Sequence, residues 1–409
     1  MDDRVDLAII GAGAAGLMAA IEAGRRGRWR SILLLESAAK PGAKILVAGG
    51  GRCNVTHHEV DENDFAGSTP AAIRKVLRRF DVRRTIGFFR ELGVELKREE
   101  TGKLFPVTDD ARTVLDALLG AARGAGAVIR HPCRVEEIRR EAGSFIVTGP
   151  WGSLPALRVI IATGGRSLPK SGSDGHGFEM VRSLGHSITS LVTPALVPLT
   201  LPTEHFTARL SGLSVEAELT VLSGTGRSLV SVRGSTLCAH FGLSGPAVLD
   251  VSRHYLHALS QDPGARLAIC WLPGESVESI DLALRGLGRG SAGRFLGARL
   301  PERLARALCE QAGVDPSASG VSMTRESRVS LARIVTAMIL PVTGDRGYVH
   351  AEATAGGVPL SELKLETMES RLCPGLYLCG EICDVDGRIG GFNFQWAWSS
   401  GHVAGVSVE

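Results

Sequence analysis

Glycines at a fixed spacing give this 409-residue sequence its first indication of chemistry. The stretch 11–16 reads Gly-Ala-Gly-Ala-Ala-Gly, directly after an apolar run and directly before an alanine-rich segment. Glycines at this spacing permit a sharp turn, leave room for a pyrophosphate beside the backbone and let a helix pack closely on a strand. The first N–H groups of that helix would then face the phosphates. The predicted contacts to a dinucleotide are Gly11, Gly13, Ala14, Ala15 and Gly16.

A carboxylate follows the next apolar run. Glu36 comes directly after Ser31–Leu35 and lies twenty residues beyond Gly16. At this separation an acid can accept hydrogen bonds from the hydroxyls of a ribose. Because an acid disfavours a 2′-phosphate at this point, Glu36 favours FAD or NAD over NADP. A plain strand–helix–strand unit that binds no nucleotide is the alternative, since glycines also make ordinary turns.

Three consecutive glycines, 49–51, precede Arg-Cys-Asn in a segment that does not look like a core element. A loop of this composition presents backbone N–H groups and a guanidinium to an anionic or electron-rich ligand. A flexible surface loop is the alternative. The arginine beside the cysteine also favours a lowered thiol pKa. We expect contacts to the cofactor from Lys44, Gly50, Gly51, Arg52, Cys53 and Asn54.

Two later apolar runs also enter glycine turns. The stretch 157–165 ends in Thr-Gly-Gly, and the stretch 375–381 ends in Cys-Gly-Glu. Parallel strands bind ligands at their carboxyl ends, and the Gly-Gly pair at 390–391 would open a helix toward an electron-rich ring edge. By analogy with flavin-binding folds, the backbone near Val135 contacts an adenine. The further predicted contacts are Val135, Thr163, Gly164, Gly165, Gly380, Glu381, Gly390 and Gly391.

The elements that must position these residues alternate between strands and helices over the first 190 residues. Apolar periodicity predicts a helix over 70–92 and another over 110–123, followed by strands over 127–131, 134–138 and 144–148. Near residue 191, prolines begin to punctuate short alternating stretches, which is typical of antiparallel sheet. The segment 276–312 is helical in pattern. We therefore expect an α/β nucleotide-binding domain that is interrupted by an insertion from about residue 191 to residue 341.

Composition excludes several classes of protein. The net charge is only +3, so charge alone implies neither a nucleic-acid nor a membrane partner. The acidic start is no signal peptide, and no apolar run reaches the ~18 residues of a membrane span. We interpret the eight cysteines as reduced thiols of a cytoplasmic protein, and we expect no metal site, because the spacing of Cys379 and Cys383 supports neither zinc nor a redox pair.

Four stretches together resemble the BaiN-type family of bacterial flavoproteins, which is also described as aminoacetone-oxidase-like. They are residues 11–16, 49–56, 241–246 and 380–401. The resemblance implies FAD as cofactor and a glutathione-reductase-like Rossmann domain, 1–190 plus 342–409. It also implies FAD contacts from the turn 384–393, at Asp384, Phe392 and Asn393. It also implies an inserted β-barrel-like domain, 191–275 plus 320–341, and a helical subdomain, 276–319. The sequence departs from the family pattern at Cys238-Ala239 and at Arg388-Ile389, which leaves FAD binding intact but weakens any transfer of substrate identity.

The predicted function is therefore that of an FAD-dependent oxidoreductase, which takes hydride from NAD(P)H and reduces an activated C=C or carbonyl of a small organic substrate. Such a reduction needs a proton donor and a group that polarises the carbonyl, and the candidates are Arg52, Cys53 and His240. No second complete GxGxxG is present, so an oxidase of a small amine such as aminoacetone is one alternative. A flavin-dependent RNA-modifying or RNA-binding factor is another, because residues 74–84 are rich in arginine, although a solvated helical face explains them as well. We expect a monomer or a homodimer.

Overall fold

The computed structural model describes residues 4–409, which form two compact units. The first unit contains the chain up to Pro194 together with Ala351–Glu409, and the second contains Ala195–His350. Each unit has its own apolar core. The first unit is therefore discontinuous in sequence, and the second is inserted into it.

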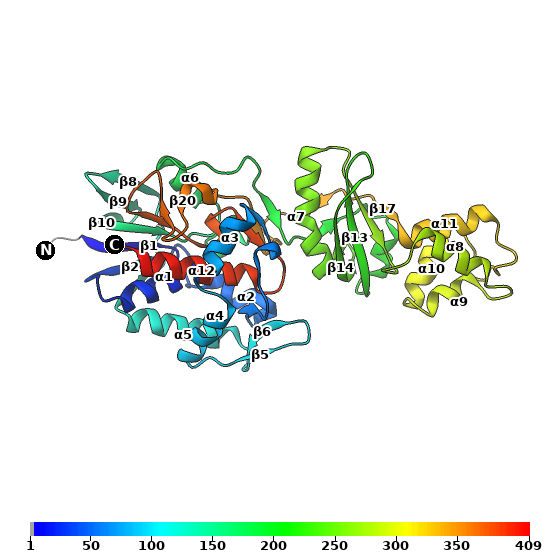
Figure 1. Cartoon of the computed structure of the whole chain (residues 1–409), viewed down its shortest axis with the longest axis horizontal. Helices are drawn as coiled ribbons and strands as arrows, with labels where there is room; N and C mark the ends of the chain where they lie inside the picture. The colour runs from blue at the N-terminus through cyan, green and yellow to red at the C-terminus, as the bar shows by residue number, and fades with distance from the viewer. Residues whose placement is uncertain (1–3) are drawn as a thin grey trace. The chain divides into compact units, whose positions relative to one another are not determined.

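A parallel sheet forms the centre of the first unit (Figure 1). Strands β1 (Val5–Ile10), β2 (Ile32–Leu35), β7 (Ala127–Arg130), β10 (Gly152–Ile161) and β22 (Leu376–Leu378) lie in the order β22-β10-β1-β2-β7, and every neighbouring pair is parallel. The residues of β1 and β2 that face the core are apolar and buried, as expected of a sheet covered on both faces. Antiparallel strands extend it: β20 (Leu363–Lys364) and β21 (Glu369–Ser370) beside β22, and β8 (Glu137–Glu141) and β9 (Ser144–Gly149) beside β10.

Two helices from opposite ends of the sequence pack against each other on this sheet. Helix α1 (Ala14–Arg25) lies along α12 (Phe392–Ser407). Added Cβ atoms on Gly401 and Gly405 of α12 would lie 2.5 Å from the carbonyl oxygens of Ala15 and Ala19, so only glycine permits this approach. Helix α12 is buried around most of its circumference, and Trp396 and Trp398 lie in the core.

The remaining elements of the first unit cover the sheet and connect its strands. They include α2 (Ala43–Gly51), β3 (Thr56–His57), η1 (Glu62–Asp64), β4 (Phe65–Gly67), α3 (Pro70–Leu77), α4 (Val82–Glu91), β5 (Leu96–Arg98), β6 (Lys103–Pro106), α5 (Ala111–Gly124), η2 (Pro169–Ser171), α6 (His176–Ser183), β11 (Thr193–Ala195), β19 (Ala353–Ala355), η4 (Leu360–Glu362), η5 (Gly380–Ile382) and β23 (Val385–Gly387).

Two predicted elements have different bounds in the structure. The single helix expected over 70–92 is two helices, because Asp81 caps α4 by accepting a hydrogen bond from the Arg84 N–H at 2.9 Å. The strand expected over 134–138 begins only at Glu137. Residue 134 lies outside it, where its carbonyl accepts a hydrogen bond from the Trp151 indole at 2.6 Å.

The second unit is built on an antiparallel sheet. Its strands lie in the order β17-β16-β13-β14-β15-β12-β18, and α7 (Pro246–Gln261) packs on β13 and β14. Four further helices, α8–α11, lie between β16 and β17 in the sequence. The closure of this sheet into a barrel remains a prediction, and so does a separate helical subdomain over residues 276–319. The bounds are β12 (Leu199–Thr200), η3 (Phe206–Leu210), β13 (Ser214–Leu222), β14 (Ser228–Ala239), β15 (Gly242–Ser244), β16 (Arg266–Cys270), α8 (Val277–Arg285), α9 (Ala292–Gly297), α10 (Glu302–Gln311), α11 (Arg325–Thr336), β17 (Met338–Leu340) and β18 (Gly344–Asp345).

Candidate functional site

The carboxyl ends of four parallel strands gather most of the predicted cofactor contacts. The glycine turn 11–16 follows β1, Glu36 follows β2, the Thr-Gly-Gly turn 163–165 follows β10, and Gly380 with Glu381 follows β22. Because β22, β10, β1 and β2 are adjacent and parallel, these four turns lie at one edge of the sheet. This edge is where open α/β sheets bind their ligands.

The three glycines of the first turn differ in what surrounds them. An added Cβ on Gly11 would lie 2.5 Å from the carbonyl oxygen of Ala162, and one on Gly16 would overlap the carbonyl oxygen of Gly11. Both glycines are therefore needed for the packing of the protein itself. A Cβ on Gly13 would meet no described atom within 4 Å, and its φ of −84° suits any residue. The open space beside Gly13, at the start of α1, fits the pyrophosphate of a dinucleotide.

Glu36 is buried, and each of its two carboxylate oxygens accepts a hydrogen bond from a backbone N–H group. One oxygen accepts a hydrogen bond from the Ala12 N–H at 2.8 Å, and the other accepts one from the Ala38 N–H at 2.8 Å. A carboxylate offers about four acceptor positions. Glu36 can therefore fix the glycine turn and still accept hydrogen bonds from ribose hydroxyls.

Buried polar groups without a partner support a polar ligand at this edge. Within residues 4–409, the Asn54 amide oxygen and the Ser173 hydroxyl are buried and have no hydrogen-bond partner. Ser173 lies beside the strand-end turn, because a Cβ on Gly164 would be 2.8 Å from its Oγ. Val135 is buried in the segment that precedes β8. Since each unsatisfied group costs about 1–3 kcal/mol, these groups fit a large polar cofactor such as FAD.

Lys44 and Glu381 form the charged centre of this edge. The Lys44 ammonium lies 2.6 Å from one Glu381 oxygen and donates to the Ser167 hydroxyl at 2.8 Å. The other Glu381 oxygen accepts from Ser167 at 2.9 Å and from the Thr354 N–H at 2.7 Å. Burial by itself would raise the pKa of Glu381, but Lys44 and these hydrogen bonds hold the pKa below its ordinary value. Sequence analysis singled out neither Ser167 nor Thr354 as a contact, because no motif marks them.

The triple-glycine segment is partly helical, which the sequence did not predict. Helix α2 begins regularly, but Ala48, Gly49 and Gly50 leave helical geometry, and both glycines have positive φ. A Cβ on Gly50 would meet no described atom within 4 Å, as at Gly13. Gly49, in contrast, is packed against the Phe105 ring and leaves no room for a side chain.

The predicted reactivity of Cys53 is wrong. Its side chain is completely buried, and burial raises the pKa of the thiol to about 12. The neighbouring arginine does not offset this effect, because Arg52 points to other partners. Its guanidinium lies 2.6 Å from Glu99 and 3.6 Å from Asp109, over the face of the Phe105 ring. A cofactor or catalytic contact of Arg52 stays a prediction, and these two carboxylates compete with any ligand for its donors.

The turn before α12 is held by the helix itself. The Asn393 side chain accepts a hydrogen bond from the Gly387 N–H at 2.8 Å and donates to the Gly387 carbonyl at 3.0 Å. A Cβ on Gly391 would lie 2.6 Å from the Thr56 backbone, so the turn also packs tightly on β3. Phe392, the first residue of α12, stacks on His57 with 5.0 Å between ring centroids. The N-terminus of α12 and the Gly390–Gly391 turn are thus rigidly placed.

Asp384 is a buried carboxyl close to this turn. Burial and the neighbouring Asp386 raise the pKa of Asp384 to about 6, while the Ser68 hydroxyl at 3.4 Å counteracts them. Cys379 and Cys383 lie nearby as free, buried thiols, and burial raises the pKa of Cys379 to about 12. Residues 4–409 contain no group of three or more metal-ligating side chains and no helix long and apolar enough to cross a membrane.

His240, the third catalytic candidate, belongs to the second unit. It is exposed, and its ring lies edge-on to the neighbouring Phe241 with centroids 5.1 Å apart. The Arg346 guanidinium covers the face of the same Phe241 ring at 4.3 Å. The structure therefore places Arg52 and Cys53 in one unit and His240 in the other.

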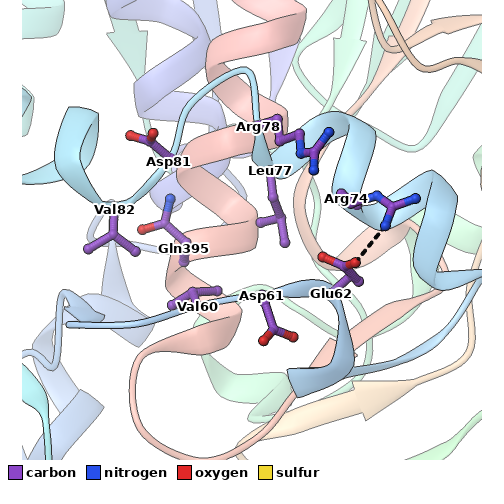
Figure 2. Close-up of a pocket in the computed structure, with 9 residues that line it drawn as sticks. All are labelled: Val60, Asp61, Glu62, Arg74, Leu77, Arg78, Asp81, Val82 and Gln395. Atoms are coloured by element: carbon purple, nitrogen blue, oxygen red, sulfur yellow. Dashed lines mark hydrogen bonds and ion pairs between the residues drawn. The ribbon is translucent and has the colours of Figure 1, made fainter.

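A separate cavity of about 250 Å³ opens on the first unit between the segment 60–62, α3, the start of α4 and α12 (Figure 2). Gln395 reaches it from α12, but its amide is fully engaged with Thr56, Thr85 and Phe80. Arg74 and Glu62 form an ion pair of 3.0 Å at its wall. Acidic, basic and apolar side chains all line the cavity, so its composition favours no single class of ligand. The lining residues are Val60, Asp61, Glu62, Arg74, Leu77, Arg78, Asp81, Val82 and Gln395.

Comparison with known proteins identifies relatives along almost the whole chain. Residues 5–407 match the family described as the HI0933-like protein Rossmann domain. A 3-dehydro-bile acid delta(4,6)-reductase of Clostridium scindens is 33% identical over 98% of both chains. A ribosomal RNA dihydrouridine synthase of Escherichia coli is 34% identical over 97% of this chain and 96% of its own. The enzyme of the same name from Haemophilus influenzae is 32% identical over 98% of both chains.

Solved structures share the fold at much lower sequence identity. The quinol fumarate reductase FrdA subunit of Escherichia coli matches 99% of this chain and 70% of its own, with 17% identity and a TM-score of 0.53. A quinol-fumarate reductase with menaquinol matches 98% of this chain and 70% of its own, with 17% identity and a TM-score of 0.50. The architecture is therefore the Rossmann-type α/β fold of FAD-binding proteins.

Proposed function

Because the chain belongs to the HI0933-like Rossmann family and is an FAD-dependent oxidoreductase, we propose that it reduces a carbon–carbon double bond conjugated to a carbonyl in a small organic substrate. In the proposed reaction, the substrate, NAD(P)H and one proton give the saturated carbonyl compound and NAD(P)⁺. The observation that carries the proposal is the near full-length similarity to a reductase that acts on a 3-dehydro-bile acid.

FAD would lie at the sheet edge described above. The free N–H groups at the start of α1 and the open space beside Gly13 would hold the pyrophosphate, and Glu36 would bind the adenosine ribose. The turns at 163–165, 380–381 and 390–393, with the triple-glycine bend, would hold the rest. When bound, FAD supplies hydride transfer in two steps, from NAD(P)H and then to the substrate.

The protein's own residues contribute charge and shape at this edge. Lys44 balances the Glu381 carboxylate, so a buried acid beside the cofactor does not oppose negative charge there. The start of α12 adds the positive end of a helix dipole on the side of the Gly390–Gly391 turn. The helix dipole favours an electron-rich ligand, which is what a cofactor that accepts hydride becomes.

Rapid mixing in the absence of oxygen tests the proposal. Purified protein should be yellow, and NADH or NADPH should bleach its flavin absorbance within seconds. An α,β-unsaturated ketone added next should restore the absorbance and be recovered as the saturated ketone. Colourless protein that takes up no added FAD would contradict the proposal. Bleaching by aminoacetone, with none by NADH or NADPH, would indicate the oxidase instead.

Uridine in RNA is a second candidate substrate. Two relatives that match almost the full chain are named ribosomal RNA dihydrouridine synthases. The C5=C6 bond of uracil is conjugated to the C4 carbonyl, so its reduction belongs to the same reaction class. On α3, α4 and their connection, Arg78, Arg79 and Arg83 are exposed and have no acidic partner among residues 4–409, and such cations bind phosphates.

Ribosomal RNA fragments distinguish the two substrates. If RNA is the substrate, NAD(P)H and the holoprotein should add two hydrogen atoms to one uridine, which mass spectrometry of the digested RNA detects. Binding should also weaken steeply between about 50 and 200 mM salt. An unchanged RNA mass, together with reduction of a small enone, would favour the small-molecule substrate.

A further inference from the structure

We propose that the cavity between α3, the start of α4 and α12 binds the adenosine end of NADPH, with its base and its 2′-phosphate. The inference rests on the proposed function, which needs a nicotinamide nucleotide as electron donor. In that proposal FAD occupies the glycine turn at 11–16, so the donor needs a second site. The composition of the cavity leaves the ligand open, but the placement of its side chains does not, because apolar walls lie between a free cation and a free carboxylate oxygen.

The volume of the cavity fits one end of a dinucleotide. It measures about 250 Å³, whereas pockets that enclose a whole drug-sized ligand measure about 300–1,000 Å³. Val60, Leu77 and Val82 supply apolar walls, which suit the faces of a planar base. Gln395 closes one side as a fixed wall, because its amide oxygen and nitrogen already have hydrogen-bond partners within the protein.

Arg78 supplies an unpaired cation on one side of the cavity. Figure 2 shows the guanidinium groups of Arg74 and Arg78 on this same side. Arg74 is neutralised by Glu62 at 3.0 Å, whereas Arg78 is exposed and has no carboxylate within ion-pair distance among residues 4–409. Arginine binds phosphate through paired N–H groups, and an arginine accommodates the 2′-phosphate where dinucleotide sites accept NADP. Arg78 therefore favours a ligand with a phosphate at this end.

Asp81 lies on the side of the cavity away from the Arg78 guanidinium (Figure 2). Its Oδ1 accepts a hydrogen bond from the Arg84 N–H at 2.9 Å, which caps α4 and fixes the carboxylate in place. Its Oδ2 has no hydrogen-bond partner among residues 4–409. An ionised carboxylate only accepts hydrogen bonds, so this oxygen suits the exocyclic amino group of adenine and disfavours a carbonyl in the same place.

The cavity lies about one helical turn from the turn at which we propose that the flavin binds. Gln395 is the fourth residue of α12, and the Gly390–Gly391 turn directly precedes this helix. At 1.5 Å per residue, Gln395 is about 5 Å along the helix axis from Phe392. A dinucleotide held in the cavity by its adenosine end would therefore keep its nicotinamide end in the same unit as FAD and free to approach it.

Binding of 2′,5′-ADP to the oxidised holoprotein tests the site without turnover. This nucleotide carries the adenine and the 2′-phosphate of NADPH but no nicotinamide. In titration calorimetry, we expect R78M to bind it at least about tenfold more weakly than wild type. R123M is the matched control and should bind it as wild type does, because Arg123 on α5 is also exposed and has no acidic partner among residues 4–409. FAD content and thermal midpoint should be the same in all three proteins.

D81N tests the other end of the site. Asparagine also caps a helix, so α4 should keep its stability, but the amide nitrogen donates a hydrogen bond where the carboxylate oxygen accepts one. D81N should bind NADPH at least about tenfold more weakly than wild type. It should bind the hypoxanthine analogue of NADPH, in which a carbonyl replaces the amino group, more tightly than wild type does. Unchanged affinity of D81N for both nucleotides would overturn the contact with the base.

Flavin reduction without oxygen connects the site to the proposed function. In R78M the apparent Kd for NADPH should rise about tenfold, while the Kd for NADH and the limiting rate of bleaching stay within about twofold of wild type. Loss of 2′,5′-ADP binding in R78M, with no bleaching of wild type by either nucleotide, would uphold the site and contradict the proposed function. Failure of wild type to bind 2′,5′-ADP, equal affinity of wild type for NADH and NADPH, or unchanged binding by R78M would overturn the site. Weaker RNA binding by R78M in that case would assign the arginine to RNA.

Discussion

The Lys44 ammonium and the Glu381 carboxylate meet at 2.6 Å, although 337 residues separate them in the sequence. Lys44 comes from the helix after β2, and Glu381 comes from the turn after β22. The inserted second unit lies between them in the chain. The pair therefore joins the two separate segments of the first unit at the edge where we propose that FAD binds.

Loss of Lys44 should destabilise the first unit. In K44M the Glu381 carboxylate keeps its burial but loses its counter-charge, which we expect to cost about 2–3 kcal/mol of unfolding free energy. K44M/E381Q should be less destabilised than the sum of the single changes, because the double variant buries no unpaired charge. Urea denaturation of the four proteins measures this. Additive effects would contradict a coupled pair.

Replacement of Gly13 separates folding from cofactor binding. G13A introduces a methyl group into space that no protein atom occupies, and the φ of Gly13 suits alanine. The apoprotein should therefore keep its thermal midpoint within about 2 °C, since no contact in the protein changes. FAD affinity should fall at least about tenfold, because the methyl group takes the place of the pyrophosphate.

Two glycine variants serve as controls for G13A. G120A also meets no described atom and lies in the middle of α5, so it should keep FAD and stabilise the helix by up to about 1 kcal/mol. G16A should fail to fold properly, because its Cβ overlaps the Gly11 carbonyl. Full FAD binding by G13A, measured by equilibrium titration of flavin fluorescence, would place the pyrophosphate elsewhere.

The pH dependence of stability should reveal Asp384. Its pKa in the folded protein is about 6, above the ordinary value of 3.8, so folding disfavours the charged form. The contribution of Asp384 to stability is complete below about pH 4 and declines as the pH rises to about 6. Above about pH 6, the raised pKa of Asp384 lowers the free energy of unfolding by about 3 kcal/mol relative to its value below about pH 4. D384N should therefore be more stable than wild type at pH 7 and close to it at pH 4.

A carboxylate with the opposite shift provides the comparison. The N–H groups of Gly224 and Gly264 donate to Asp262 and lower its pKa. D262N should therefore destabilise the protein at pH 7 rather than stabilise it. Thermal midpoints of both variants between pH 4 and pH 8, with and without FAD, test the pair. Parallel curves for wild type and D384N would contradict the raised pKa of Asp384.

Cys53 should prove dispensable for chemistry. Its thiol is buried and stays protonated at neutral pH, because burial raises its pKa to about 12. Iodoacetamide should leave Cys53 unmodified in the native protein at pH 8, as peptide mass mapping can establish. C53A should keep the rate of enone reduction within about threefold of wild type. A loss of about 100-fold with full FAD content would restore Cys53 as a catalytic group.

Local sequence patterns predicted the family and the Rossmann-type fold, because glycines at fixed spacing and apolar runs reflect backbone requirements. These patterns could not predict which hydrogen-bond donors already have a partner within the folded protein. Arg52 looked available because Glu99 and Asp109 lie far along the chain, and only folding brings them to it. Cys53 was misjudged because burial is a property of the whole unit.

The glycine contacts between α1 and α12 have a consequence for biosynthesis. The ribosome makes α1 before the inserted unit and α12 after it, yet Gly401 and Gly405 fit against Ala15 and Ala19 with no intervening side chain. The inserted unit, which has an apolar core of its own, is complete in sequence before α12 emerges. During translation the inserted unit can thus fold first, whereas the first unit can complete its fold only after α12 has been synthesised.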